Sequence, residues 1–295
     1  MDRIISGLCL DDTIRISAIS AAGMIETAQR THGLSRVATA ALGRQLMMTA
    51  MMAARLKDED SRLTTIIAGD GLAGNMVCSG KPDGTVKGYT PNPEVELPLK
   101  PDGKIDVGGY VGHGGKLTVI SDLSMKEPYV GTCNLVSGEI AEDFAQYFLT
   151  SEQQPSIVYL GVQLRADTNT VIAGGGLFIS ALPNCPDEAV DRVSERIAKI
   201  AEFTSSLAEG EPIEAALEAI FEGLNFRIVE TKDTGFVCDC SRDRLEKALI
   251  SVGEKDLCDI IEQDGQAELT CQFCNKKYFF DREQLTELLT EARHE

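Results

Sequence analysis

Four cysteines in the last quarter of this 295-residue chain have the spacing of a metal site. Cys238 and Cys240 flank a single aspartate, and Cys271 and Cys274 follow about thirty residues later with two residues between them. Zinc prefers four tetrahedral ligands, and two short-range pairs separated by a long loop are a usual arrangement. With no histidine or fifth ligand nearby, the pattern predicts a closed four-cysteine site for one Zn²⁺, without an open catalytic position.

The same thiols are also suited to redox chemistry. C-x-x-C is the spacing of redox-active pairs, and zinc holds cysteines as thiolates, the form that oxidants attack. Oxidation would release the metal, and a small domain that depends on zinc for its folding would then unfold. A static zinc-binding interaction module, whose cysteines never change oxidation state, fits this spacing equally well. Cys258, between the two pairs, is interpreted as a small core residue, with an accessory thiol as the alternative.

Composition disfavours several other classes of protein. The formal net charge of −18 predicts no nucleic-acid partner, because such a chain repels a phosphate backbone. Three histidines and no G-x-S-x-G motif predict that the protein is not an enzyme. No apolar run approaches the roughly 20 residues that span a bilayer, and the acidic start lacks a signal-peptide pattern. We therefore expect a cytoplasmic protein without a membrane partner, in which nine cysteines do not form a disulfide framework.

Residues 1–182 are predicted to form an α+β core domain. The helix expected at 35–57 is apolar around most of its circumference, as a helix buried on all sides is, and its methionines are expected to fill the core. The Pro-Asp-Gly turns at 81–84 and 100–103 are tight, so the strands they join must be antiparallel. The glycines of 69–74 match a dinucleotide fingerprint, but a strand follows them, which predicts a hairpin loop. A second helix is expected at 139–149, and strands are expected at 13–19, 63–68, 75–79, 85–90, 104–107, 116–121, 158–164 and 171–179.

Residues 183–230 are predicted to form an amphipathic helical linker. Two apolar stripes have helical spacing. The first comprises Val190, Val193, Ile197, Ile200 and Phe203, and the second comprises Ile213, Leu217, Ile220 and Phe221. The stripes fit a helical hairpin packed permanently on the sheet domain; they also fit a detachable segment whose apolar face binds other proteins.

Residues 231–295 are predicted to form a small C-terminal zinc-binding domain. Two short helices are expected between residues 242 and 263, followed by the cysteine knuckle and a strand at 278–280. Asp281 and Gln284 have the spacing of a capping box, which predicts a final helix.

The chain resembles the heat shock protein 33 family of redox-regulated holdase chaperones over essentially its whole length. The C-x-C and C-x-x-C pairs carry the most specific part of the resemblance. Further matching segments are 41–44, 128–129, 137–143, 151–156, 173–176 and 264–268, of which 151–156 reads S-E-Q-Q-P-S.

The resemblance implies a function and a mechanism. In this family the reduced, zinc-bound form is inactive, and peroxide or hypochlorite forms two disulfides, which here would be Cys238–Cys240 and Cys271–Cys274. Zinc then leaves, the switch domain and linker lose order, and apolar surface binds unfolding proteins without ATP. The active form tends to be a homodimer. The two stripes of residues 183–230 thereby become a candidate client-binding site, while Cys258 is outside the family's four switch positions.

Overall fold

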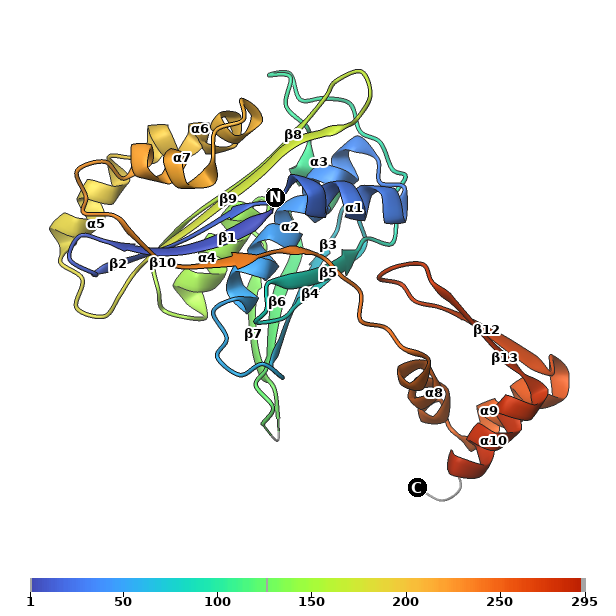
Figure 1. The fold of residues 1–295 in the computed structure, drawn as a ribbon. Helices are drawn as coiled ribbons and strands as arrows, with labels where there is room; N and C mark the ends of the chain where they lie inside the picture. The colour runs from blue at the N-terminus through green and yellow to red at the C-terminus, as the bar shows by residue number, and fades with distance from the viewer. Residues whose placement is uncertain (1, 126, 293–295) are drawn as a thin grey trace. The chain divides into compact units, whose positions relative to one another are not determined.

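The computed structural model describes residues 2–125 and 127–292. The chain divides into two compact units, one up to Val237 and one from Cys238 onward. Each unit contains helices and antiparallel strands, so the predicted α+β class is confirmed (Figure 1). Among the described residues, no helix is both long and apolar enough to cross a lipid bilayer.

The first unit contains a five-stranded antiparallel sheet. Its strand order is β10-β1-β2-β9-β8, so the N-terminal strand pairs on one side with a strand more than two hundred residues later. Side chains alternate between the two faces: Ile4 and Ile19 pack toward helix α2 (Arg36–Ala53), whereas Ile5 and Ile16 belong to a second core on the opposite face. The strands are β1 (Arg3–Cys9), β2 (Ile14–Ser20), β8 (Ser156–Leu164), β9 (Val171–Ala181) and β10 (Arg227–Asp233).

A six-stranded sheet completes the strands of this unit, in the order β11-β5-β4-β3-β6-β7. All its neighbours are antiparallel except β11 and β5. Residues 70–74 form the loop of the β3–β4 hairpin and Gly69 ends β3, so the predicted hairpin loop is confirmed. The strands are β3 (Arg62–Gly69), β4 (Asn75–Gly80), β5 (Thr85–Tyr89), β6 (Gly115–Asp122), β7 (Tyr129–Asn134) and β11 (Gly235–Phe236).

Helix α2 (Arg36–Ala53) packs against strands of both sheets and forms the centre of the unit. Ser35 caps it by accepting a hydrogen bond from the N–H of Ala38 at 3.1 Å. Every residue of α2 except Arg36 and Arg44 is buried, including all four methionines. The predictions of a buried helix and of methionines as core residues are confirmed. The other helices of this region are α1 (Ala22–His32), α3 (Val107–Val111) and α4 (Ala141–Thr150).

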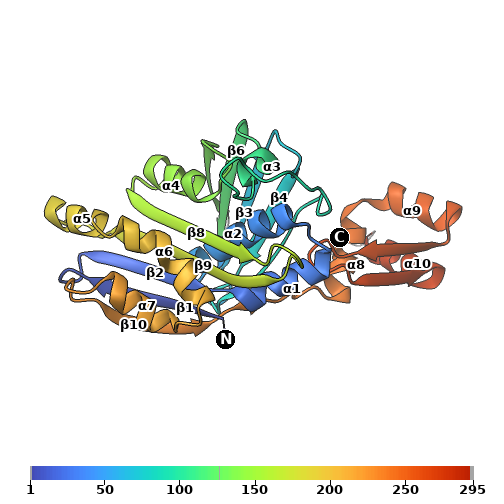
Figure 2. The ribbon, with the colours of Figure 1, turned by 90° about the horizontal axis from the view of Figure 1, so that it is seen from above.

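Three helices cover the second face of the five-stranded sheet: α5 (Asp187–Ser194), α6 (Ile197–Ala208) and α7 (Ile213–Ile220). Figures 1 and 2 show them following one another across this face. Their buried side chains share one core with Ile5, Ile16 and Leu177 of the sheet. The first apolar stripe is therefore divided between two helices.

The C-terminal unit contains α8 (Arg242–Ser251), α9 (Glu254–Gln263), the hairpin β12 (Gln266–Thr270) and β13 (Lys277–Asp281), and α10 (Arg282–Ala292). Its small core centres on Leu257, Phe280 and Leu285, each fully buried. The capping box is confirmed: the N–H of Gln284 donates to the Asp281 carboxylate at 3.0 Å, and the N–H of Asp281 donates to the Gln284 side chain at 3.2 Å.

Two local expectations need correction. The strand predicted at 104–107 is absent, because Asp106 instead caps the short helix α3 by accepting a hydrogen bond from the N–H of Gly109. The helical region also ends before residue 230, since residues 227–233 pair with β1. The assignment of 183–230 as a functional linker stays a prediction.

Candidate metal centre and covered apolar face

The cysteine cluster lies within the C-terminal unit, on segments held by short local hydrogen bonds. Cys238 and Cys240 precede α8, which begins after the capping residue Ser241. Cys271 follows β12, and Cys274 precedes β13. The N–H of Cys271 donates to the carbonyl of residue 276 at 2.9 Å, and the N–H of residue 275 donates back to the Cys271 carbonyl at 2.8 Å. This tight knuckle turns the last two cysteines toward the first two.

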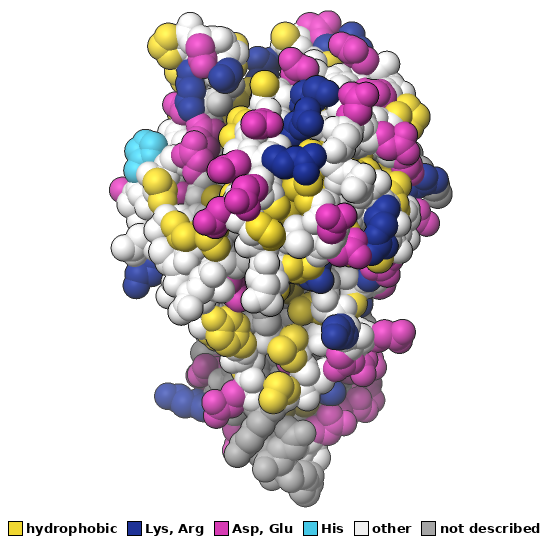
Figure 3. Space-filling model, turned by 90° about the vertical axis from the view of Figure 1, so that its left-hand side faces the viewer, with side chains coloured by type: hydrophobic (Ala, Val, Ile, Leu, Met, Phe, Trp, Pro, Cys, Tyr) yellow, Lys and Arg dark blue, Asp and Glu magenta, His cyan; other side chains and the backbone are white. Residues whose placement is uncertain are grey.

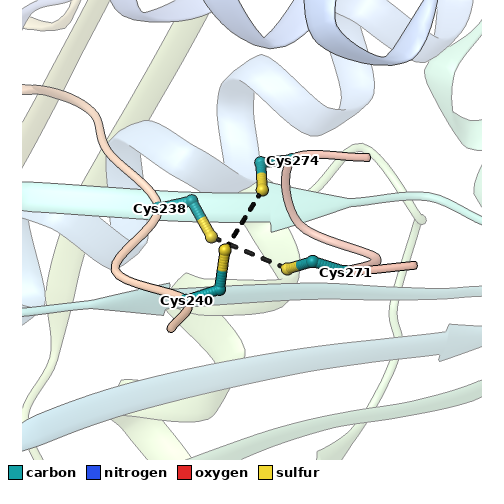
Figure 4. A group of neighbouring side chains, drawn as sticks. All are labelled: Cys238, Cys240, Cys271 and Cys274. Carbon is teal, nitrogen blue, oxygen red and sulfur yellow. Dashed lines mark hydrogen bonds between the residues drawn. The ribbon is translucent and has the colours of Figure 1, made fainter. Parts of the chain in front are cut away.

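The four sulfur atoms converge (Figure 4). All lie within 4.8 Å of one another, with 3.7 Å between the Sγ atoms of Cys238 and Cys271 and 3.4 Å between those of Cys240 and Cys274. Tetrahedral zinc with Zn–S bonds of about 2.3 Å requires sulfur atoms about 3.8 Å apart. The cluster therefore has the dimensions of a metal centre. All four are free thiols, so the two disulfides implied by the resemblance stay untested.

The thiols perturb one another's protonation. Burial raises the pKa of Cys240, but hydrogen bonds from the Tyr278 hydroxyl, at 3.2 Å, and from neighbouring thiols outweigh it and lower the pKa to about 7. Burial raises the pKa of Cys238 well above its usual value, and burial also raises the pKa of Cys274. Four thiols this close cannot all ionise without a cation, because like charges oppose each other.

The chemistry of the donor set fits a thiophilic dication. The group contains four sulfurs and neither histidine nor carboxylate, which favours zinc over magnesium or calcium. Four protein ligands complete a tetrahedron and leave no position for a substrate, as in structural sites. Cys258 is half-buried and lies outside both this group and the small core, so its interpretation as a core residue is not supported.

Two residues that the sequence did not single out support the centre. Tyr278 places its hydroxyl between the Sγ and the carbonyl oxygen of Cys240, at 3.2 Å from each. Arg242 donates to the carbonyl of Phe279 at 3.0 Å and to Gln284 at 2.8 Å, and it lies 4.3 Å from the ring centre of Phe280. The only sequence feature that could have identified Tyr278 or Arg242 is that each lies close to a cysteine motif in the chain.

The predicted client-binding residues are mostly covered. Of the nine, Val190 and Ile197 are exposed, at 41% and 55%, whereas the other seven are at most 5% exposed. The buried seven pack against the five-stranded sheet; they are Val193, Ile200, Phe203, Ile213, Leu217, Ile220 and Phe221. On the face shown in Figure 3, exposed hydrophobic side chains lie in small groups between acidic and basic ones.

A small number of polar contacts attach these helices to the sheet. Tyr159 on β8 donates to the Ala201 carbonyl and to the Thr204 hydroxyl, both at 3.1 Å. Arg3 on β1 forms an ion pair with Glu214 on α7 at 3.0 Å. The two side chains are 40% and 35% exposed. Exposed ion pairs contribute at most about 1 kcal/mol. The attachment therefore depends mainly on apolar burial.

Comparison with known proteins agrees with this architecture. The family profile described as "Hsp33 protein" matches residues 2–281. The chain is 45% identical to the 33 kDa chaperonin of Alkaliphilus metalliredigens (strain QYMF), over 98% of this chain and 99% of that protein. It is 41% identical to the 33 kDa chaperonin of Clostridioides difficile (strain 630), over 98% and 99% of the two chains.

A solved structure shares the fold. The crystal structure of the 33 kDa chaperonin (heat shock protein 33 homolog) from Thermotoga maritima has a TM-score of 0.88 and 36% sequence identity. The superposition covers 100% of this chain and 99% of that one. Because the profile and both relatives span nearly the whole length, this chain belongs to the Hsp33 family of chaperones.

Proposed function

We propose that this protein is a redox-regulated, ATP-independent holdase whose reduced form binds one zinc ion through Cys238, Cys240, Cys271 and Cys274. The convergence of four free thiols at the spacing of a zinc tetrahedron carries the proposal. When bound, zinc would hold the four sulfurs as thiolates and supply folding free energy to the C-terminal unit.

The proposed activation is oxidation of the thiols by peroxide. A thiolate attacks one oxygen of hydrogen peroxide, the O–O bond breaks, and a sulfenic acid forms as hydroxide leaves and takes up a proton. A second thiolate then attacks the sulfur of the sulfenic acid and displaces hydroxide, and the hydroxide takes up a proton and leaves as water. Formation of each disulfide thus removes two electrons from a pair of thiolates and reduces one peroxide to two waters. The pairing implied by the family is Cys238–Cys240 and Cys271–Cys274.

Loss of these ligands should unfold the C-terminal unit, because its apolar core is small. Six buried residues form that core, against eighteen on the helix-covered face of the first unit. A domain of this size usually needs a metal or disulfides to be stable. Val237, the residue before Cys238, is still tied to β5 by a 2.9 Å hydrogen bond to the Val86 carbonyl. Disorder beginning at Cys238 therefore starts next to the β10–β11 segment.

The proposed client site is the apolar face now shared by α5–α7 and the sheet. Detachment would expose the seven buried stripe residues and the sheet residues beneath them. The partners are unfolding proteins in the cytoplasm, held without catalysis, and the oxidised form is expected to be a homodimer. The net charge of −18 would keep such a protein soluble while it holds apolar clients.

The test follows zinc and chaperone activity together. Peroxide is added to the reduced, zinc-loaded protein at raised temperature. A chromogenic chelator measures the zinc that is released, and light scattering measures the aggregation of an unfolded client protein. We expect zinc release and suppression of aggregation to begin together and to reverse with reductant. Cys258→Ser is the matched control and should respond like the unmodified protein, whereas Cys240→Ser should retain zinc poorly.

Two results would overturn the proposal. Zinc retained throughout peroxide treatment would favour the static zinc-binding module. Equal suppression by the reduced and oxidised proteins would leave a chaperone that the cysteines do not regulate.

A further inference from the structure

A basic cavity lies at the C-terminal end of α2, away from the apolar face described above. Its volume is about 450 Å³, and its lining comes from β1, β2, β10 and residues 54–57. Four of the lining residues are basic and only Glu230 is acidic; the basic ones are Arg15, Arg55, Lys57 and Lys232. In a chain with 46 acidic and 28 basic side chains, this local excess of positive charge is unusual.

Two of these cations, Arg15 and Arg55, are close together. Within residues 2–125 and 127–292, neither Arg15 nor Arg55 donates a side-chain hydrogen bond or forms an ion pair. Both are half-buried, and the guanidinium of Arg55 lies 4.9 Å from the ring centre of Phe178. The pKa of Arg55 is lowered to about 10, mainly because the guanidinium is buried and to a smaller extent because of the positive charge of Arg15. Glu152 acts on Arg55 from a distance, but its carboxylate accepts the hydroxyl of Tyr147 at 2.7 Å.

Capping of α2 does not account for these two arginines. Lys232 already caps the helix, because its ammonium donates to the Ala54 carbonyl at 2.9 Å and to the Pro82 carbonyl at 3.2 Å, and it lies 3.4 Å from Glu230. Gathering two further guanidiniums nearby costs Coulomb energy. A bound anion would offset that cost.

The backbone is also irregular at this cavity. The β1–β10 ladder shifts register between Ser6 and Gly7, which pair with Glu230 and Ile228, so Val229 has no partner residue on β1. Such bulges bend a strand and redirect its side chains, and they are common next to binding sites. Here the bulge lies on the wall of the cavity, because Val229, Ser6 and Gly7 all line it.

We propose that this cavity binds the phosphate group of a small phosphorylated molecule. Guanidinium groups bind phosphate oxygens through paired N–H donors, and Arg15 and Arg55 both have theirs free. The ammonium groups of Lys57 and Lys232 add charge around the same space. A volume of about 450 Å³ lies within the range of small-molecule sites. This site is independent of the proposed redox function, since no cysteine lines the cavity.

Isothermal titration of the reduced, full-length protein with pyrophosphate tests the proposal. Ionic strength is held constant with chloride, and citrate is titrated in parallel as a carboxylate ligand of similar charge. We expect saturable pyrophosphate binding that weakens about 10- to 100-fold in Arg15→Gln, because a hydrogen bond to a charged group is lost. Arg15→Lys should retain part of the affinity, and Lys57→Gln should weaken binding without disturbing the fold, because Lys57 is exposed. Lys104→Gln, at an exposed side chain outside this cavity, should leave the affinity unchanged.

Three outcomes would overturn the proposal. The first is absence of saturable pyrophosphate binding. The second is binding equally affected by Arg15→Gln and Lys104→Gln, which would indicate general charge attraction. The third is tighter binding of citrate than of pyrophosphate, which would assign the cavity to carboxylates. Circular dichroism of each variant separates loss of the site from loss of the fold.

Discussion

Replacing Gly161 with alanine should push helix α6 away from the sheet. Gly161 lies on β8 opposite Gly175, and its backbone has a conformation that alanine can adopt without strain. A Cβ atom there would collide with the Thr204 hydroxyl and lie 2.9 Å from both the Thr204 Cβ and the Tyr159 hydroxyl. Thr204 is buried on α6, so the helix must shift outward.

The size of the effect follows from three contributions. Overpacking costs about 1–3 kcal/mol. Weakening the two hydrogen bonds from Tyr159 to α6 costs about 0.5–1.5 kcal/mol each, and removing glycine from a strand returns about 0.5–1 kcal/mol. At their central values these contributions give a net cost of about 3 kcal/mol, which shifts the docking equilibrium of α6 roughly 150-fold toward release.

Hydrogen exchange measured by mass spectrometry reports this equilibrium. In the reduced protein, amides of α6 should exchange faster by that factor, whereas amides of α2 should be unchanged. Gly235→Ala is the control, because an added Cβ there meets no atom within 4 Å. Unchanged exchange in α6 would refute the packing argument, and equal acceleration in α2 would show that the unit opens as a whole. If α6 exchanges faster but the reduced variant suppresses aggregation no better, α6 does not cover the client site.

Four further predictions address other parts of the chain. Once zinc is removed and the C-terminal unit unfolds, Cys240 should be alkylated by iodoacetamide with the midpoint of an ordinary thiol, about pH 8.5, because the contacts with Tyr278 and the other thiols that lower its pKa to about 7 are lost. A midpoint near pH 7 would show that the thiol cluster stays assembled without zinc. Cys9, whose pKa burial raises to about 12, should stay unreactive up to pH 9 in mass-spectrometric mapping. Leu257→Ala should destabilise the C-terminal unit by about 2–5 kcal/mol and lower its zinc retention, because Leu257 is fully buried in a small core. Asp143→Asn should lower the unfolding free energy of the first unit by about 1–3 kcal/mol in urea titration, since the buried carboxylate accepts N–H groups at 2.7–3.3 Å from residues 136–138 and at 2.9 Å from Ile140.

Features that depend on local spacing could be predicted from the sequence. One or two residues separate the cysteines of each pair, so their proximity follows from chain geometry. Only the meeting of the two pairs needed the fold, and it depends on the β12–β13 hairpin, of which β13 alone was predicted. The burial of α2 followed from apolar residues around most of its circumference, and the cap of α10 followed from the spacing of Asp281 and Gln284.

Features that depend on distant pairing were decided by the tertiary structure. Residues 227–233 form β10 because they pair with β1 at the edge of the five-stranded sheet. Neither strand was predicted from the sequence. Periodicity identified the apolar stripes, but only the sheet beneath them determined that Phe203 is buried and Ile197 exposed. The approach of Arg15 to Arg55 likewise has no local signal.

The sequence by itself thus determined the two cysteine pairs, the α+β class and the positions of the apolar stripes, because each rests on residues that are neighbours in the chain. The tertiary structure decided which stripe residues are covered, where the two units divide and where the cations gather. These properties depend on contacts between segments tens to hundreds of residues apart, which spacing along the chain does not encode.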